Sequence, residues 1–267
     1  MAKLAAYENI SQDSGFPTTL HPNFNPHIRN YEPPDPIREE ISPPKDRAFF
    51  ADPSKLSLLS VATATDLTES IGTVLSGIQL SNLNEKQLDE LALLVNERGV
   101  VFFRGQDLTT EKQVKLCQHY GILDRHPAQK VQQHVTIKGS IVDNRQLANY
   151  TPWPVSDFHA DASLELNPPS YSLLRMEEHP AVGGDTAWLS QYGLYDALSD
   201  HLKKFVEGLH AVHTSRLQYD TIVDLWGTGP NRLPIGTHHP AVRTHPVTGQ
   251  RALNVNPGFV TGKQPSP

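Results

Sequence analysis

The pattern of apolar residues changes near residue 130, and this change constrains the fold more than any other feature of the chain. Before it, apolar residues recur with the spacing of amphipathic helices at 84–99 and 110–120. After it, short apolar segments alternate with turns that contain proline or glycine, which is typical of strands. These expected strands cover residues 171–176, 185–189, 240–245 and 251–255. Helices first and strands later predict an α+β domain built on an antiparallel sandwich or jelly roll.

The helix expected at 84–99 has the clearest local signals. Asn84 is placed to cap its first turn, with Gln87 at the capping-box position, and Gly99 marks its end. One face of this helix is apolar at helical spacing, through Leu88, Leu91, Ala92 and Val95. A buried strand is expected to follow at 100–103. Later, a further helical stretch interrupts the strands, and its apolar face holds Leu202, Phe205, Val206 and Leu209.

Proline and polar residues predict the boundaries of the domain. Residues 1–55 are rich in Pro, Asn, Asp and Ser, which predicts an extended or disordered arm. The folded domain is expected over 56–262, and the short segment 263–267 is expected to be a tail outside it. The hairpin expected at 240–255 is followed by no closing strand or helix. The sheet is therefore expected to be truncated at the C-terminus, with an open edge.

Charge and cysteine content exclude several classes of protein. With 267 residues and a net charge of −6, the chain has no basic character that would favour nucleic acid or an anionic membrane. It has no signal-peptide core and no run approaching the ~18 apolar residues of a membrane span. The single cysteine, Cys117, permits no intramolecular disulfide and is expected in the core. A cytoplasmic protein is therefore expected, and a homo-oligomer is left open.

His159 and Asp161 are the first candidates for a metal site. Alternate side chains of a strand project to the same side, so the pair could supply two ligands of a 2-His-1-carboxylate iron site. With 13 histidines in the chain, about one such spacing is expected by chance, and spacing alone favours a polar surface strand. The bulky neighbours Trp153 and Phe158 favour the edge of a pocket instead.

Other segments carry further candidates. The sequence 183–186, Gly-Gly-Asp-Thr, is strong turn chemistry, although the Thr186 hydroxyl could also donate to a bound carboxylate. His126, which precedes Pro127, is either a structural loop residue or an anion-binding residue at the mouth of a pocket. The later histidines are interpreted first as turn or packing residues and second as candidates for a third metal ligand. They are His210, His213, His238, His239 and His245.

A series of motifs in a fixed order resembles the taurine/α-ketoglutarate dioxygenase family of the TauD/TfdA type, and its fungal sulfonate-dioxygenase branch in particular. The series contains the segments 98–104, 126–127, 159–161, 183–188, 239–249 and 255–259. The late segment, with the sequence His-Pro-Ala-Val-Arg-Thr-His-Pro, is the most specific when taken together with Gly-Gly-Asp-Thr. The resemblance covers 56–262 and implies a double-stranded β-helix, a cupin-like jelly roll, with flanking helices.

The resemblance also implies roles for particular residues. His159 and Asp161 match two Fe(II) ligands. Thr186 matches a residue that binds 2-oxoglutarate, and His126 matches one that contacts a sulfonate. Phe158 stands where many members carry Trp. The third metal ligand and the arginine that holds 2-oxoglutarate match no residue here, so both are expected to be absent from this chain.

Three functional hypotheses remain open at this point. The first is an Fe(II)- and 2-oxoglutarate-dependent dioxygenase that uses O₂ to hydroxylate a small organic acid, a sulfonate such as taurine being one candidate. The expected truncation predicts that this chain is inactive on its own. The second is a non-catalytic jelly-roll remnant that binds a partner through its open edge. The third is a zinc hydrolase that uses His159, Asp161 and one late histidine.

Overall fold

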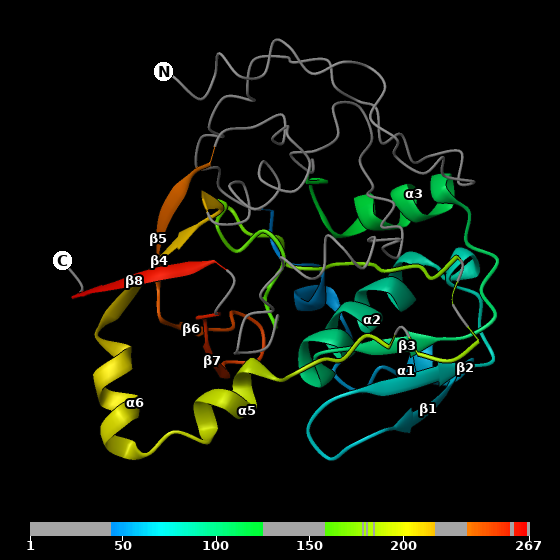
Figure 1. The fold of residues 1–267 in the computed structure, drawn as a ribbon. Helices are drawn as coiled ribbons and strands as arrows, with labels where there is room; N and C mark the ends of the chain where they lie inside the picture. Colours follow the sequence, from blue (N-terminus) through cyan, green and yellow to red (C-terminus); the bar gives the residue numbers. More distant parts are fainter. Residues whose placement is uncertain are drawn as a thin grey trace, which may run out of the picture.

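The computed structural model describes residues 44–124, 158–177, 179, 181–183, 185–216, 234–256 and 259–265. Its elements form two groups that lie side by side (Figure 1). The first group contains η2 (Arg47–Phe50), α1 (Leu56–Leu59), β1 (Thr63–Asp66), β2 (Thr73–Ser76), η3 (Leu80–Asn82), α2 (Glu85–Arg98), β3 (Val101–Phe103) and α3 (Thr110–Tyr120). The second contains α5 (Gln191–Asp196), α6 (Asp200–Glu207), β4 (Leu209–Thr214), β5 (Gly236–Pro240), β6 (Val242–Thr244), β7 (Arg251–Leu253) and β8 (Val260–Pro265).

Helix α2 forms where the sequence predicts it. The Asn84 side chain accepts a hydrogen bond from the Gln87 amide, and the Gln87 side chain accepts one from the Asn84 amide, at 3.0 Å each. This reciprocal pair satisfies two amides that would otherwise lack partners in the first turn. Gly99 ends the helix with φ +70°, a left-handed conformation that favours glycine. The predicted capping box and glycine stop are therefore both confirmed.

The first group packs around a small sheet and a core of leucines. β1 pairs antiparallel with β2, and β2 pairs in parallel with β3. A buried cluster of leucines joins α2 and α3 to this sheet. Its members are Leu58, Leu75, Leu80, Leu88, Leu91, Leu94, Leu108 and Leu116. The predicted strand at 100–103 is confirmed as β3, although its side chains are half-buried rather than buried. Cys117 is also half-buried, and burial raises the pKa of its thiol.

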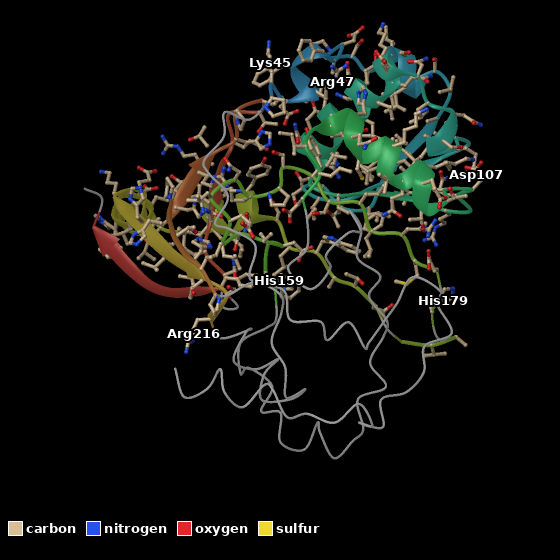
Figure 2. The ribbon with its side chains drawn as sticks, turned by 90° about the horizontal axis from the view of Figure 1, so that it is seen from above. Lys45, Arg47, Asp107, His159, His179 and Arg216 are labelled. Atoms are coloured by element: carbon tan, nitrogen blue, oxygen red, sulfur yellow. The ribbon has the colours of Figure 1, made fainter. Side chains whose placement is uncertain are left out.

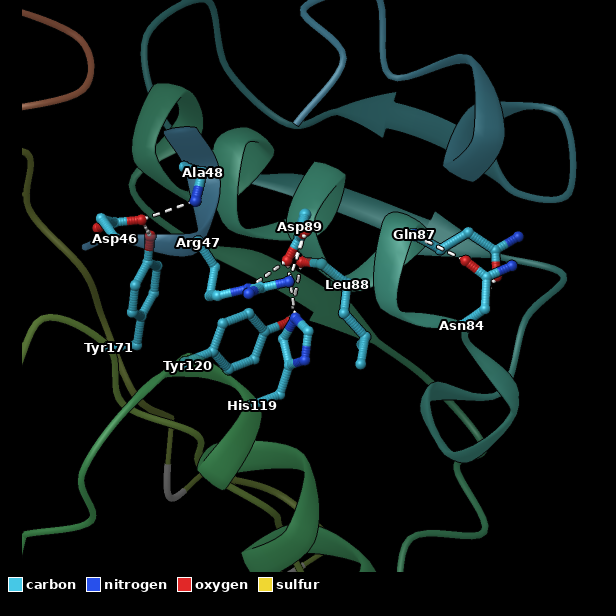
Figure 3. Close-up of polar contacts among 10 residues, drawn as sticks. All are labelled: Asp46, Arg47, Ala48, Asn84, Gln87, Leu88, Asp89, His119, Tyr120 and Tyr171. Carbon is cyan, nitrogen blue, oxygen red and sulfur yellow. Dashed lines mark hydrogen bonds and ion pairs between the residues drawn. The ribbon is translucent and has the colours of Figure 1, made fainter. Parts of the chain in front are cut away.

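The segment before Leu56 is packed in its described part, where the sequence predicts an extended arm as far as residue 55. Arg47 in η2 donates two hydrogen bonds to the Asp89 carboxylate of α2, at 2.7 and 2.8 Å (Figure 3). His119 of α3 contacts the same carboxylate at 2.8 Å. Asp46 accepts hydrogen bonds from the Tyr171 hydroxyl and from the backbone of η2. Residues 44–55 therefore belong to the folded body, because η2 is fixed to α2 and α3.

The second group contains two further small sheets. β4 lies between β5 and β8 and pairs antiparallel with both. β6 and β7 form the antiparallel hairpin that the sequence predicts. β8 runs through residues 263–265, so the segment expected to be a tail outside the domain takes part in the sheet. No helix among the described residues is long and apolar enough to cross a membrane.

Two expected strands and one helix end differ from the prediction. Residues 171–177 and 185–190 are irregular, without strand pairing. Their backbone finds other partners, since Gln113 of α3 donates a hydrogen bond to the Leu173 carbonyl at 3.0 Å. The late helix is confirmed as α6, but it ends at Glu207, and Leu209 opens β4. Two members of its apolar face, Leu202 and Phe205, are exposed.

Candidate functional site

The His159–Asp161 pair lies on a turn, and this corrects the expectation of a strand. Residues 158–160 are irregular and 161–164 form a turn. The two side chains nevertheless meet, with His159 Nε2 at 3.0 Å from Asp161 Oδ1. Both are accessible, with 44% of the His159 side chain and 72% of the Asp161 side chain exposed. Ala162 follows directly with φ +51°, a left-handed conformation that is strained for any residue with a Cβ atom. The pair therefore lies where the chain enters a turn with a strained residue, and not on a strand.

Two residues of β5 hold the backbone of this turn against the second group. The Thr237 hydroxyl donates a hydrogen bond to the Leu164 carbonyl at 2.9 Å. His239 Nε2 lies 2.8 Å from the Glu165 carbonyl and must donate to it, because a carbonyl oxygen only accepts. Thr237 and His239 alternate along β5, so both project from the same face of the sheet. That face therefore supports the turn that carries Asp161.

Ser163 joins the turn to two further buried residues. Its hydroxyl lies 3.1 Å from His213 Nδ1 on β4 and 3.3 Å from Asn256 Nδ2. Ser163, His213 and Asn256 are 3%, 0% and 7% exposed. The Asn256 side chain also accepts a hydrogen bond from the Phe259 amide at 3.0 Å. The Phe259 ring in turn contacts the His159 ring edge to face, with centroids 5.7 Å apart. These buried polar contacts thus lie next to the segment that carries the accessible pair.

His213 is the most perturbed histidine of the described part of the chain. Burial lowers its pKa to about 4, and the neighbouring His239, whose ring centroid lies 5.3 Å away, acts in the same direction. The side chain is therefore neutral at physiological pH. Its Nε2 atom is buried and has no hydrogen-bond partner among the described residues.

The remaining late histidines serve the turns and the surface. His245 Nδ1 accepts hydrogen bonds from the Val247 and Thr248 amides in the β6–β7 turn, and burial lowers its pKa. His238 is exposed on β5, and His210 is half-buried on β4. The described residues contain no group of three or more His, Cys, Asp or Glu side chains that could hold a metal ion. The positions of His245 and His238 agree with roles in a turn and on the surface, and the assignment of a third metal ligand stays a prediction.

The spacing of the pair fits adjacent ligands of one metal ion. Two atoms that each lie about 2.1 Å from an ion, at about 90° to one another, are separated by about 3.0 Å. His159 Nε2 and Asp161 Oδ1 have this separation, and imidazole with carboxylate is a donor set suited to Fe(II). The pair can therefore hold two adjacent coordination positions. Figure 2 shows His159 on the segment that runs beside the sheet of β4, β5 and β8.

Thr186 and His126 are the other candidates of the sequence. Thr186 is exposed in the irregular segment 185–190, where the sequence predicts a strand. Trp188 packs edge to face on Phe102 of β3, with centroids 5.1 Å apart. His126 lies outside the described residues. A cleft lined by Leu93, Glu97, Val247, Thr248 and Gln250 opens between α2 and the hairpin turn, and it shares no residue with the pair.

Sequence reasoning missed the buried residues that support the turn. Ser163, Thr237 and Asn256 carry no motif of their own, and their contacts join positions 50 to 93 residues apart along the chain. The sequence alone indicates His213 as a turn or packing residue, or as a third metal ligand. Its hydrogen-bonded neighbour Ser163, two positions after Asp161, is the local signal that could have indicated a supporting contact.

Comparison with known proteins identifies the family to which this chain belongs. The model of the taurine catabolism dioxygenase TauD, TfdA family matches residues 63–266. A crystal structure of a taurine dioxygenase from Burkholderia xenovorans aligns with a TM-score of 0.57 and 31% sequence identity, over 76% of this chain and 66% of that chain. The chain belongs to the TauD/TfdA family, an Fe(II)/α-ketoglutarate-dependent dioxygenase family. The family implies a non-haem Fe(II) and 2-oxoglutarate.

Fungal relatives are similar over most of this chain but extend beyond it. An α-ketoglutarate-dependent dioxygenase of Penicillium expansum is 36% identical over 256 residues, 90% of this chain and 70% of that protein. An α-ketoglutarate-dependent sulfonate dioxygenase of Saccharomyces cerevisiae is 34% identical over 203 residues, 72% of this chain and 48% of that protein. A Schizosaccharomyces pombe relative is 37% identical and covered over 56% of its length. The chain thus spans about half the length of the two yeast relatives.

Proposed function

We propose that this protein takes part in the Fe(II)- and 2-oxoglutarate-dependent hydroxylation of a small organic acid, with His159 and Asp161 as two metal ligands. The observation that supports this proposal most strongly is the 3.0 Å approach of His159 Nε2 and Asp161 Oδ1 on a supported turn, in a chain of the TauD/TfdA family. Sulfonates such as taurine are the first substrates to test, because a sulfonate dioxygenase is among the relatives.

The chain's own residues provide binding and orientation at this site. Iron, when bound, supplies the oxidative chemistry that couples 2-oxoglutarate to O₂. His159 and Asp161 would hold the ion through an imidazole nitrogen and a carboxylate oxygen. The Phe259 ring packs on His159 and limits the rotation of the imidazole. We propose Thr186 as a hydrogen-bond donor to the 2-oxoglutarate carboxylate and His126 as a contact for the acidic group of the substrate.

The assignment is tested by metal binding and turnover in the same protein. Anaerobic Co(II) titration reports the ligands, because Co(II) prefers the same nitrogen and oxygen donors as Fe(II) and binds somewhat more tightly. Succinate release with Fe(II), 2-oxoglutarate and taurine reports the reaction. His159→Ala and Asp161→Ala should each abolish both signals, whereas His238→Ala, which changes an exposed histidine of β5, should leave both unchanged.

The outcomes separate the competing functions. A zinc hydrolase is indifferent to 2-oxoglutarate, and a binding remnant releases no succinate with any substrate. Wild-type Co(II) affinity in both ligand variants would refute the assignment of His159 and Asp161. Co(II) binding that depends on the pair, without 2-oxoglutarate-dependent succinate release, would retain the metal site and reject dioxygenase activity for this chain.

A further inference from the structure

A buried hydrogen bond between Ser163 and His213 holds the turn that carries Asp161. The proposed function assigns no role to this bond. We propose that His213 is a positioning residue for the candidate metal ligand Asp161 and acts on it through Ser163. This inference rests on the proposed function, because the positioned carboxylate is the one assigned to the metal. His213 lies on β4 and reaches the turn through the contact of its Nδ1 atom with the Ser163 hydroxyl.

The directions of the hydrogen bonds define the state of His213. The Asn256 amide nitrogen can only donate, so it donates to the Ser163 hydroxyl oxygen. The Ser163 hydroxyl proton is then directed to His213 Nδ1, which accepts. Accepting at Nδ1 requires a neutral ring that carries its proton on Nε2, and the lowered pKa of this buried side chain agrees with the neutral form. The chain of donors therefore runs from Asn256 through Ser163 to His213.

The strained backbone shows why the turn needs this support. Ala162 lies between Asp161 and Ser163 with φ +51°, a conformation that residues other than glycine adopt only when their surroundings impose it. The Ser163 side chain and the Leu164 and Glu165 carbonyls are held by the second group immediately after Ala162. The left-handed residue therefore connects this fixed segment to Asp161, and the Ser163 amide closes the turn by donating to the Ala160 carbonyl on the other side of Asp161.

Histidine supplies a group at position 213 that an apolar core residue lacks. The side chain is fully buried, and a leucine would fill a similar space. What a leucine could not supply is the acceptor at the Nδ1 position for Ser163. The contact with Ser163 is therefore the feature that distinguishes histidine from an apolar residue here.

The test compares three substitutions of His213 with a matched control. His213→Leu removes the acceptor and keeps an apolar core. His213→Asn keeps an acceptor near the Nδ1 position, and His213→Gln moves it toward the Nε2 position. His238→Leu changes a histidine of the neighbouring strand β5 that is exposed. Each variant is first compared with the wild type by thermal unfolding, and folded variants are then titrated with Co(II) under anaerobic conditions.

We expect Co(II) affinity to fall by roughly 10- to 100-fold in His213→Leu, the range typical when a group that supports a metal ligand is removed. His213→Asn should recover most of the affinity, His213→Gln should not, and His238→Leu should match the wild type. The pair of amide variants keeps the inference testable if the leucine variant fails to fold. Equal affinity in the asparagine and glutamine variants would overturn the role of the Nδ1 acceptor.

Amide hydrogen exchange in 160–165 tests the support of the turn without any metal. The Ser163 and Glu165 amides donate to the Ala160 and Ala162 carbonyls, so their exchange reports the turn directly. Exchange should accelerate at least tenfold in His213→Gln and remain near wild type in His213→Asn. If the wild type binds no Co(II), the proposed function fails while exchange still decides whether His213 holds the turn. Unchanged exchange in both amide variants would overturn the inference even if the metal site stands.

Discussion

Replacing Asp89 with alanine should destabilise the protein strongly, because this carboxylate joins three separate elements. Asp89 of α2 accepts two hydrogen bonds from Arg47 of η2 and contacts His119 of α3 (Figure 3). Its side chain is 8% exposed, against 30% for Arg47 and 14% for His119. The substitution removes all three contacts at once and leaves the two partners without their acceptor.

The expected loss follows from the burial of these groups. Removing one partner of a buried ion pair costs about 3–5 kcal/mol, because the remaining charge stays desolvated. Arg47 is close to one third exposed and can turn toward water, so the lower end of the range applies. A loss of about 3 kcal/mol corresponds to a decrease in Tm of about 6–12 °C for a domain of this size.

Differential scanning calorimetry or urea unfolding of the full chain measures this loss. Asp107→Ala is the matched control, since Asp107 and Lys112 form an ion pair at 2.8 Å with about half of each side chain exposed. The control should leave Tm nearly unchanged, because exposed ion pairs contribute little. An Asp89→Ala protein that unfolds within about 2 °C of the wild type would refute the idea that this cluster fixes η2 to the helices.

Three further results are expected. Asn84→Ala removes one half of the capping box and should cost about 1 kcal/mol in thermal unfolding, with no loss if the cap is dispensable. Thr186→Val should weaken 2-oxoglutarate binding by about one to two decades, and an unchanged affinity would return Thr186 to a turn role. His213 has a folded pKa of about 4 against 6.5 when unfolded, so stability should fall by up to about 3 kcal/mol as the pH drops through that window. His213→Asn should remove this part of the pH dependence, and identical profiles would contradict it.

The helical elements could be predicted because their signals are local. The cap, the apolar face and the stop of α2 all lie within residues 84–99. The sequence of this segment is therefore sufficient to predict the helix. The β6–β7 hairpin was predicted for the same reason, since its two strands are joined by one short turn. Elements whose stabilising contacts are close in sequence can be recognised without knowledge of the fold.

Strands with distant partners could not be predicted in this way. An apolar segment becomes a strand only if another strand pairs with it, and the segment 171–177 instead packs along the helices of the first group. Leu173 joins the leucine core, and its carbonyl accepts a hydrogen bond from a side chain of α3. Conversely, residues 263–265 looked like a polar tail, and their pairing with β4 supplies the order that their composition does not.

At the candidate metal site, too, local signals could be predicted from the sequence and contacts between distant residues could not. The identity of His159 and Asp161 could be predicted from the motif, but the reason offered for their proximity was wrong, because a strand was expected where a turn exists. The left-handed Ala162 joins the pair to the segment 163–165, and contacts to buried residues of β4 and β5 hold that segment in place. The contacts that hold the segment after Asp161 come from buried residues, and the contact of Ser163 with His213 is one of them. Substitutions in the buried support should therefore change metal affinity more than substitutions at exposed neighbours that lie closer to the ligands in sequence.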